Sequence, residues 1–399
     1  MSADAVPTFS VTRTCPYAPP AEHRRLREES PIAKVKLPNG RVVWVATSHK
    51  DIRAILSDPR FSSNRRNPNF PTLAHERPPS SALKPLLLEL DPPEHGPARR
   101  AVLGEFTLQR MNALTPRIQQ IVDEHIDAML AGPRPVDLVQ ALSLPVPSLV
   151  ICELLGVPYS DHEFFQTRSS HMVNQKTPAD LIARSVGELM MYLGKLVAAK
   201  AQNPTDDLLS RQIQKQRETG DVDYEGLVGT AFLLLIAGHE TTANMISLST
   251  LALLQHPEQL AAIQKDPSKT IGAVEELLRY FTIAESALGR VAIEDVEIGG
   301  VLIRAGEGIF ALANTANRDP EVFAKADDLD LERGSRNHLA FGFGPHQCLG
   351  QNLARLELQI VIDTLFKRIP GLRPAVPVEE LSFKENTTVY GMNEFPVTW

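Results

Sequence analysis

The stretch FGFGPHQCLG, residues 341–350, places three glycines and one proline around a single histidine and a single cysteine. Glycine and proline normally interrupt regular structure, yet the amphipathic run QNLARLELQIVIDTLFKRI follows at once. The pattern predicts a tight loop that delivers Cys348 to the first turn of a helix over residues 349–368. A cysteine in that position faces unpaired N–H groups and the positive end of the helix dipole. Both lower the thiol pKa and favour the thiolate, which is the form that binds metal.

The surroundings of Cys348 indicate what kind of metal it would bind. Cys15 and Cys152 lie far away in the sequence, and no histidine cluster stands nearby to complete a zinc or iron–sulfur site. A single thiolate ligand therefore suggests that a cofactor supplies the remaining ligands, as haem does when cysteine is its axial ligand. The alternative is a free cysteine in a structural turn. The arrangement of the glycines over the whole decapeptide argues against this alternative.

The composition restricts the class of protein. The chain has 399 residues, 43% hydrophobic and 22% charged, as in ordinary globular proteins, and its length alone suggests two or three domains. The net charge of −7 argues against a nucleic-acid-binding protein. Three cysteines fit a reducing compartment. We see neither a secretory signal nor an apolar run of the ~18 residues that a membrane span needs, so we expect a cytoplasmic protein without a membrane.

The hydrophobic pattern predicts a mainly α protein with a small β region near each end of the chain. Residues 1–15 read as a flexible leader, KVKLPNGRVVWVAT (34–47) as a β-hairpin, and residues 64–94 as a long proline-rich loop with one helical turn. A strand-rich patch covers 288–314, and residues 387–399 read as a final hairpin. Helices are expected near 49–58, 94–105, 108–131, 137–155, 160–173, 179–202, 205–216, 223–254, 257–265 and 268–281.

The decapeptide resembles the haem-binding signature of the cytochrome P450 family. The residues that carry the resemblance are Phe341, Gly344, His346, Cys348 and Gly350. The resemblance extends from about residue 10 to Trp399, and it implies a single P450 domain with haem b bound through Cys348. HLAFGFGPHQCLGQNLARLEL and LLLIAGHETTAN look most similar to the soluble actinomycete branch that hydroxylates secondary metabolites and drug-like molecules.

A second motif, EELLRY, spans residues 275–280. Glu276 and Arg279 are three residues apart, so they can pair on one helix face. Such a pair is often an exposed ion pair worth well under ~1 kcal/mol. The resemblance instead implies a buried structural network under the haem, with Arg333 as its third member.

A third motif, AGHETTAN at 237–244, lies in the longest expected helix. Gly238 costs about 1 kcal/mol relative to alanine in a helix interior, so something must compensate for it. One reading is a kinked helix in which a threonine bonds back to the carbonyl four residues earlier. The resemblance implies that Gly238 opens a groove beside bound O₂, and that Glu240 and Thr241 deliver protons. Thr242 is the next residue round the helix and could be confused with Thr241. We leave His239 unassigned as a packed or solvated side chain.

Basic residues outside the signature are candidates to bind the haem propionates. His95 and Arg99 are four residues apart in DPPEHGPARR and share a helix face. An isolated pair of this kind would more often be a solvated basic face. The resemblance implies that both bind propionates, together with Arg290 and His346. Four donors from separate segments converging on one cofactor favour one domain.

The resemblance also implies external partners. The chain shows neither a dinucleotide-binding fingerprint nor a cysteine set for an iron–sulfur cluster, so electrons would come from a ferredoxin and an NAD(P)H-dependent ferredoxin reductase. Arg100 and Arg355 are candidates for a basic ferredoxin-binding patch. We expect a monomer that hydroxylates a medium-sized hydrophobic small molecule with O₂.

Several segments are expected to line the substrate pocket. They are the 64–90 loop, residues 164–180, the helix around 234–241, residues 283–288 and the final hairpin. Within them the candidate side chains are Leu234, Ala237, Ile283 and Met392, and Arg77 or Glu285 would meet polar substrate groups. Other P450 oxidations remain open (epoxidation, dealkylation, ring coupling or peroxide-driven chemistry), as does a haem-thiolate sensor without catalysis.

Overall fold

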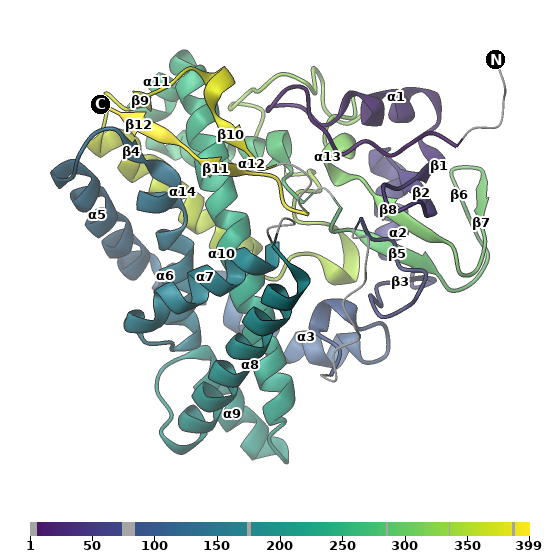
Figure 1. The fold of residues 1–399 in the computed structure, drawn as a ribbon, viewed down its shortest axis with the longest axis horizontal. Helices are drawn as coiled ribbons and strands as arrows, with labels where there is room; N and C mark the ends of the chain where they lie inside the picture. Colours follow the sequence, from purple (N-terminus) through teal and green to yellow (C-terminus); the bar gives the residue numbers. More distant parts are fainter. Residues whose placement is uncertain (1–5, 74–83, 174–176, 285, 335, 385–387) are drawn as a thin grey trace.

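A long central helix organises the molecule, which is known here from a computed structural model describing residues 6–73, 84–173, 177–284, 286–334, 336–384 and 388–399 (Figure 1). This helix, α10, runs over Tyr224–Gln255, and the Asp223 side chain caps it by accepting the Gly226 N–H. Its second half is almost entirely buried. α10 is long and apolar enough to cross a membrane, which the sequence reading had not recognised. It instead packs inside the fold against α6, α8 and α14.

Most of the other helices pack around α10 and form the left-hand part of Figure 1, with α5, α6 and α14 on one side of it, whereas α1, α2 and α13 lie beside the large sheet. The helices other than α10 are α1 (Ala21–Glu29), α2 (His49–Ser57), α3 (His95–Leu103), α4 (Leu108–Ala113), α5 (Thr115–Ala131), α6 (Pro145–Leu155), α7 (His162–Val173), α8 (Ala179–Gln202), α9 (Leu208–Thr219), α11 (Pro257–Lys265), α12 (Thr270–Phe281), α13 (Ala313–Ala316) and α14 (Gln351–Arg368).

The largest sheet lies to the right of α10 in Figure 1 and joins two distant parts of the chain. Its strand order is β1-β2-β8-β5-β3, with β2 and β8 parallel and the other neighbours antiparallel. Its strands are β1 (Ile32–Lys36), β2 (Val42–Ala46), β3 (Phe61–Ser62), β5 (Gly289–Ala292) and β8 (Gly308–Ala311). The predicted β-hairpin at 34–47 and the predicted strand patch therefore form one sheet.

The remaining strands form three small sheets. These strands are β4 (Val136–Asp137), β6 (Val296–Ile298), β7 (Val301–Ile303), β9 (Arg373–Pro374), β10 (Ser382–Phe383), β11 (Met392–Glu394) and β12 (Pro396–Thr398). β6 pairs with β7, β10 pairs with β11, and β12 lies between β4 and β9. The predicted fold class, mainly α with small β regions, is confirmed.

Three local predictions differ from the structure. The expected hairpin over 387–399 is wrong, because β11 and β12 belong to different sheets. The expected helix over 108–131 breaks at Leu114, where Pro116 begins a new helix in its first turn. The expected helix over 137–155 starts with β4 and a π-helical turn before α6.

The N-terminal segment is also more ordered than a leader would be. Phe9 is buried, its N–H donates to the Lys36 carbonyl at 2.8 Å, and the Lys36 N–H donates to the Pro7 carbonyl at 2.8 Å. Residues 7–9 therefore extend the edge of the large sheet beside β1.

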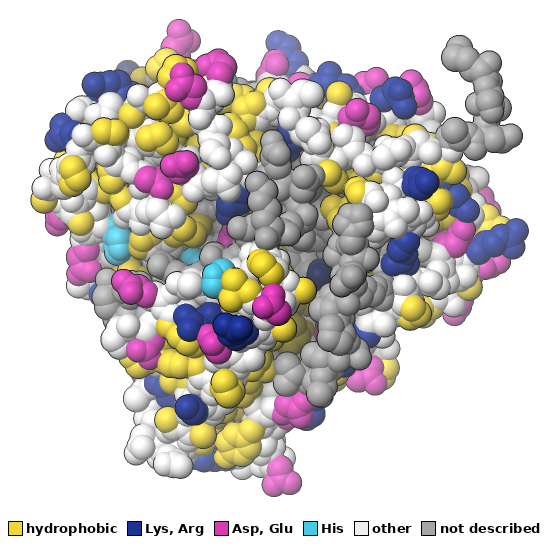
Figure 2. All heavy atoms as spheres, viewed as in Figure 1, with side chains coloured by type: hydrophobic (Ala, Val, Ile, Leu, Met, Phe, Trp, Pro, Cys, Tyr) yellow, Lys and Arg dark blue, Asp and Glu magenta, His cyan; other side chains and the backbone are white. Residues whose placement is uncertain are grey.

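Charged side chains of both signs are interspersed over the face of the described residues in Figure 2. This distribution matches a chain with 41 basic and 48 acidic residues.

Candidate active site

The loop before α14 takes the form that its glycines and proline predict. Gly342 and Gly344 have φ values of +68° and +73°, in the left-handed region that favours glycine. A Cβ on Gly344 would also lie 2.5 Å from the Leu56 carbonyl oxygen. The Cys348 N–H then donates to the Phe341 carbonyl at 2.8 Å, which closes the loop directly before α14. Close packing against the backbone of Leu56 and Ser57 thus fixes where the cysteine lies.

The Cys348 side chain is exposed in the protein alone, three residues before α14 begins. The predicted lowering of its pKa is not found. The protein atoms around the thiol raise its pKa through desolvation, and this outweighs the opposing effects of the Gly350 N–H, Arg99 and Arg355. A Cβ on Gly350 would meet no atom within 4 Å. The thiol is thus accessible to a ligand, beside backbone that carries no side chain.

Basic side chains from separate elements gather near the loop. The His95 and His346 rings lie 4.0 Å apart between centroids, and the His346 Nε2 lies 3.0 Å from the Ser63 hydroxyl. Arg99 donates to the Gln347 carbonyl at 2.5 Å. Arg290 is buried, and the sequence reading missed its neighbour Arg65.

The electrostatics of this cluster indicate that an anion belongs there. Burial lowers the pKa of Arg290 to about 10, with Arg65 adding to the effect. Burial lowers the pKa of His346 to about 3, with His95, Arg290 and Arg99 also disfavouring its charged form. Among the described residues, Asp91 is the carboxylate that acts on His95, His346 and Arg290, and Glu89 acts on Arg65.

An unpartnered buried group supports the same conclusion. The Nε2 atom of His95 has no hydrogen-bond partner among the described residues. Asp91 itself already accepts hydrogen bonds from Ser62 and Ser63. Because crowded cations and an unsatisfied ring nitrogen are costly to bury, this cluster suits two additional carboxylates. The residues present therefore fit a haem with its propionates here and its iron on Cys348.

The Glu276 network is fully buried in α12. Arg279 donates to both oxygens of Glu276, from Nε and Nη2, each at 2.7 Å, and both side chains have 0% exposure. Arg333 Nε lies 3.1 Å from the same carboxylate. Arg279 also donates to the carbonyls of Asn317 and Ala326. The structure thus brings together the three predicted members of this network, with no side chain free to act on a ligand.

A second charged network beside it was not predicted from the sequence. Glu275 accepts from Arg355 Nε at 2.5 Å and lies 3.0 Å from the His338 Nε2. Burial raises the pKa of Glu275, but the hydrogen bonds from His338 and Arg355 outweigh it and lower that pKa to about 2. Arg355 also stacks over the Phe341 ring at 4.6 Å. Arg355 therefore contributes to the fold, while its side chain stays 27% exposed, so its place in a ferredoxin-binding patch stays a prediction.

The distal part of α10 combines buried polar groups with an exposed face. Thr241 donates to the Ala237 carbonyl at 2.7 Å, the back-bond expected of a helix threonine. Leu234, Ala237 and Thr241 recur at helical spacing and are partly or fully exposed, although the residues after them are buried. A helix in the centre of the fold therefore leaves one strip of its surface accessible, as a ligand-facing strip would be.

Gly238 has a packing reason for being glycine. A Cβ there would lie 3.1 Å from the Ile151 side chain of α6, closer than most side chains tolerate. The glycine thus allows α6 to approach α10, so the predicted groove does not explain it on this side of the helix. His239 is buried, and its Nδ1 lies 2.9 Å from the Ser169 hydroxyl. Burial lowers the pKa of His239 to about 4, so the ring is neutral.

Glu240 has a partner that the sequence gave no sign of. Glu240 is buried, and Lys384, which follows β10, forms a short ion pair with its carboxylate. The two residues are 144 positions apart in the sequence, so no local pattern links them. Thr242, one residue further round the helix than Thr241, is buried.

The remaining predicted pocket residues divide into two groups. Leu234 and Ala237 lie on the exposed strip of α10. Ile283 and Met392 are buried in the hydrophobic core at 7% and 1% exposure, so neither offers free surface to a substrate. Arg77 and Glu285 lie outside the described residues, as does part of the 64–90 loop.

An accessible cysteine in a glycine-rich loop, a cationic cluster short of anions and an accessible strip on a central helix define a haem-thiolate protein. Comparison with known proteins agrees. A family model for Cytochrome P450 matches residues 161–369. The chain is 50% identical to Pentalenic acid synthase of Streptomyces avermitilis, covering 100% of this chain and 98% of the relative. It is 48% identical to Vitamin D3 dihydroxylase of Streptomyces griseolus, covering 98% and 97%.

Solved structures show the same fold. The crystal structure of cytochrome P450 MoxA from Nonomuraea recticatena superposes with a TM-score of 0.91 at 56% identity, covering 98% of each chain. The chain therefore belongs to the cytochrome P450 family, and it is a haem b monooxygenase of the actinomycete branch.

Proposed function

We propose that this P450 hydroxylates a medium-sized hydrophobic small molecule, using O₂ and two electrons delivered by a ferredoxin. The observation that carries the substrate class is the exposed strip of α10, where the apolar side chains of Leu234 and Ala237 precede the acid–alcohol pair. Pockets for small molecules are typically apolar with a few placed polar groups. Two relatives support the class, since one is named for dihydroxylating vitamin D3 and the other for synthesising pentalenic acid.

In this proposal each group of residues has a separate task. The Cys348 thiolate ligates the iron, and His95, Arg99, Arg290, His346 and Arg65 bind the propionates. The haem supplies the oxidising chemistry when bound. The Thr241 hydroxyl and the Glu240 carboxylate hold and move protons on the distal side, and Leu234 and Ala237 orient the substrate. Glu276, Arg279 and Arg333 maintain the fold beneath the cofactor.

Electrons come from outside the chain in this proposal. Arg100, in the last turn of α3, is exposed and is therefore available to an acidic ferredoxin. With Arg355 committed to Glu275, Arg100 carries the proposal for the docking patch. We further propose that the enzyme acts as a cytoplasmic monomer, which size-exclusion chromatography with light scattering tests directly.

The first experiment is the carbon monoxide difference spectrum of the dithionite-reduced holoprotein. We expect a Soret band at the red-shifted position of thiolate-ligated haem, and its loss in Cys348→Ser. NADPH consumption with a surrogate ferredoxin and reductase is then measured with a panel of hydrophobic compounds that includes vitamin D3. Hydroxylated product identified by mass spectrometry supports the proposal, whereas a thiolate band without any NADPH consumption would indicate a sensor.

A further inference from the structure

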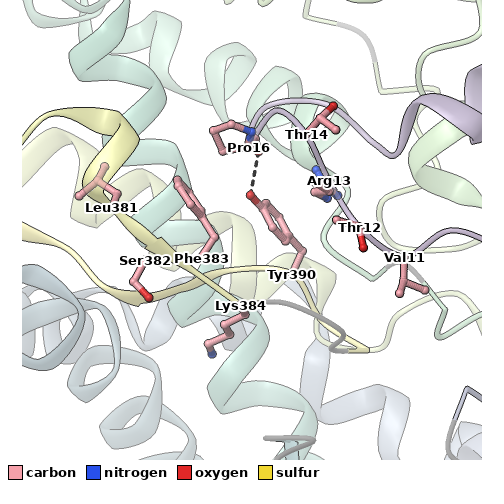
Figure 3. A pocket seen from close by; sticks show the side chains of 10 residues that line it. All are labelled: Val11, Thr12, Arg13, Thr14, Pro16, Leu381, Ser382, Phe383, Lys384 and Tyr390. Carbon is pink, nitrogen blue, oxygen red and sulfur yellow. Dashed lines mark hydrogen bonds between the residues drawn. The ribbon is translucent and has the colours of Figure 1, made fainter.

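A surface pocket lies between the N-terminal segment and the strands that follow α14 (Figure 3). Its volume is about 270 Å³, and its lining residues include Thr12, Arg13, Ser382, Tyr390 and Lys384. Figure 3 shows the Lys384 side chain at one end of this set, directed away from the N-terminal segment. Part of Lys384 therefore faces solvent in the pocket, while its ammonium group lies deeper in the protein.

The ammonium group of Lys384 reaches the distal helix. It forms the ion pair with Glu240, whose side chain is 6% exposed, while the Lys384 side chain is 18% exposed. Buried carboxylates are stable in the charged form only when they are paired. Lys384 is the partner that the described residues provide for Glu240.

The walls of the pocket hold Lys384 in place. The Lys384 N–H donates to the Gly391 carbonyl at 2.8 Å, which fixes its backbone beside β11. Tyr390 stacks against Phe383 at 6.1 Å and donates to the Pro16 carbonyl at 3.0 Å. Arg13 lies over the Tyr390 ring at 3.8 Å. The N-terminal segment thus braces the strand end that presents Lys384 to Glu240.

We propose that Lys384 is the positioning residue of the proton-delivery acid, and that the pocket it lines is where solvent protons enter. Lys384 holds the Glu240 side chain in one orientation between the pocket and the exposed strip of α10. In each transfer the Glu240 carboxylate takes up one proton from solvent through the pocket and then releases that proton towards Thr241, so Glu240 returns to a carboxylate paired with Lys384. This inference rests on the proposed function of Glu240 and adds an entry route and a residue to it.

The first test is a double-mutant cycle on thermal stability, which does not depend on turnover. Lys384→Met keeps the length of the side chain but leaves the Glu240 carboxylate buried without a partner. We expect it to lower the melting temperature by about 4 °C, because it breaks one side of a buried ion pair and the shift per unit of free energy is small for a chain of this length. Adding Glu240→Gln should restore part of the loss. Additive effects would overturn the ion pair and the proposal with it.

The second test separates positioning from a merely structural role. Lys384→Met, Lys384→Arg and the control Lys269→Met, which removes an exposed ion pair with Glu332, are compared as holoproteins. The rate of reduction under carbon monoxide reports electron delivery and should be equal in all of them. NADPH oxidation should fall about 10- to 100-fold in Lys384→Met, the cost of a misplaced catalytic group. Its solvent deuterium isotope effect should rise.

Lys384→Arg should retain most of the rate because it keeps the charge next to Glu240. An unchanged rate and isotope effect in Lys384→Met, with electron delivery intact, would overturn the proposal even if the melting cycle shows coupling. Measurements on the protein without substitutions distinguish failure of this proposal from failure of the proposed function. If that protein lacks a thiolate–carbon monoxide band or consumes no NADPH, it is the proposed function that has failed.

Discussion

Arg279→Met removes the best-connected charge in the protein. The guanidinium is fully buried and donates to both Glu276 oxygens and to the carbonyls of Asn317, Ala326 and Asp328. After the substitution Glu276 keeps Arg333, which contacts the same carboxylate at 3.1 Å, but three backbone carbonyls lose a donor. The change therefore leaves a partly compensated buried charge together with several unsatisfied acceptors.

The expected cost follows from these contacts. Breaking one side of a buried ion pair typically costs about 3–5 kcal/mol, against a total domain stability of roughly 5–15 kcal/mol. The control Lys269→Met breaks a pair whose members are 42% and 71% exposed, so it should change the stability little. Adding Glu276→Met to Arg279→Met should recover part of the loss, because it removes the buried carboxylate.

Urea unfolding of the haem-free proteins, followed by far-ultraviolet circular dichroism, measures these differences without any contribution from cofactor binding. The slope of free energy against urea should be unchanged if only stability differs. A cost for Arg279→Met no larger than that of Lys269→Met would refute the reasoning that this network stabilises the fold. A double variant less stable than the single one would refute the role assigned to the buried carboxylate.

Three further predictions concern Gly344 in the loop before α14, Glu275 in α12 and His95 in α3. Gly344→Ala should reduce folding yield by forcing a Cβ to within 2.5 Å of the Leu56 oxygen at positive φ, as the soluble fraction and melting temperature will show. Glu275 has a folded pKa near 2 against 4.5 in the unfolded chain, so its contribution, at most about 3 kcal/mol, is present above pH 4.5 and lost as the pH falls towards 2. Stability measured from pH 6 to 3 should therefore fall less steeply in Glu275→Gln. His95→Ala should increase the rate of haem transfer to apomyoglobin while leaving the haem-free stability nearly unchanged.

Local sequence patterns were sufficient for most elements. The bounds of α8 and α11 agree with the prediction because each has a sustained helical period between clear breaking residues. The final hairpin failed because its two strands read as neighbours, although β11 pairs with β10 and β12 pairs with β9 and with the distant β4. A proline can both end one helix and begin the next, which is why the break at Leu114 was not seen.

The candidate site was predictable where a motif is contiguous and hidden where it is not. Cys348 and Gly344 stand out in one decapeptide, and the Glu276–Arg279 spacing is visible on a helix. Lys384 meets Glu240 across 144 residues, and neither residue has an unusual local setting that would link them. The contacts of Arg355 with Glu275 and Phe341 were likewise not predicted, because these residues lie far from it in the sequence or show no pairing pattern with it.

The pairing of β2 with β8 has a consequence for how the chain is made. Trp44 in β2 lies in register with Ile309 in β8, and Val136 in β4 with Val397 in β12. Contacts between residues so far apart form slowly, since a long stretch of chain must be ordered before they contribute. During synthesis β2 cannot pair with β8 until more than half of the chain has been made, so the large sheet stays incomplete until then. Until then their open edges are exposed to other chains, so this is the period in which the nascent protein is most prone to aggregate.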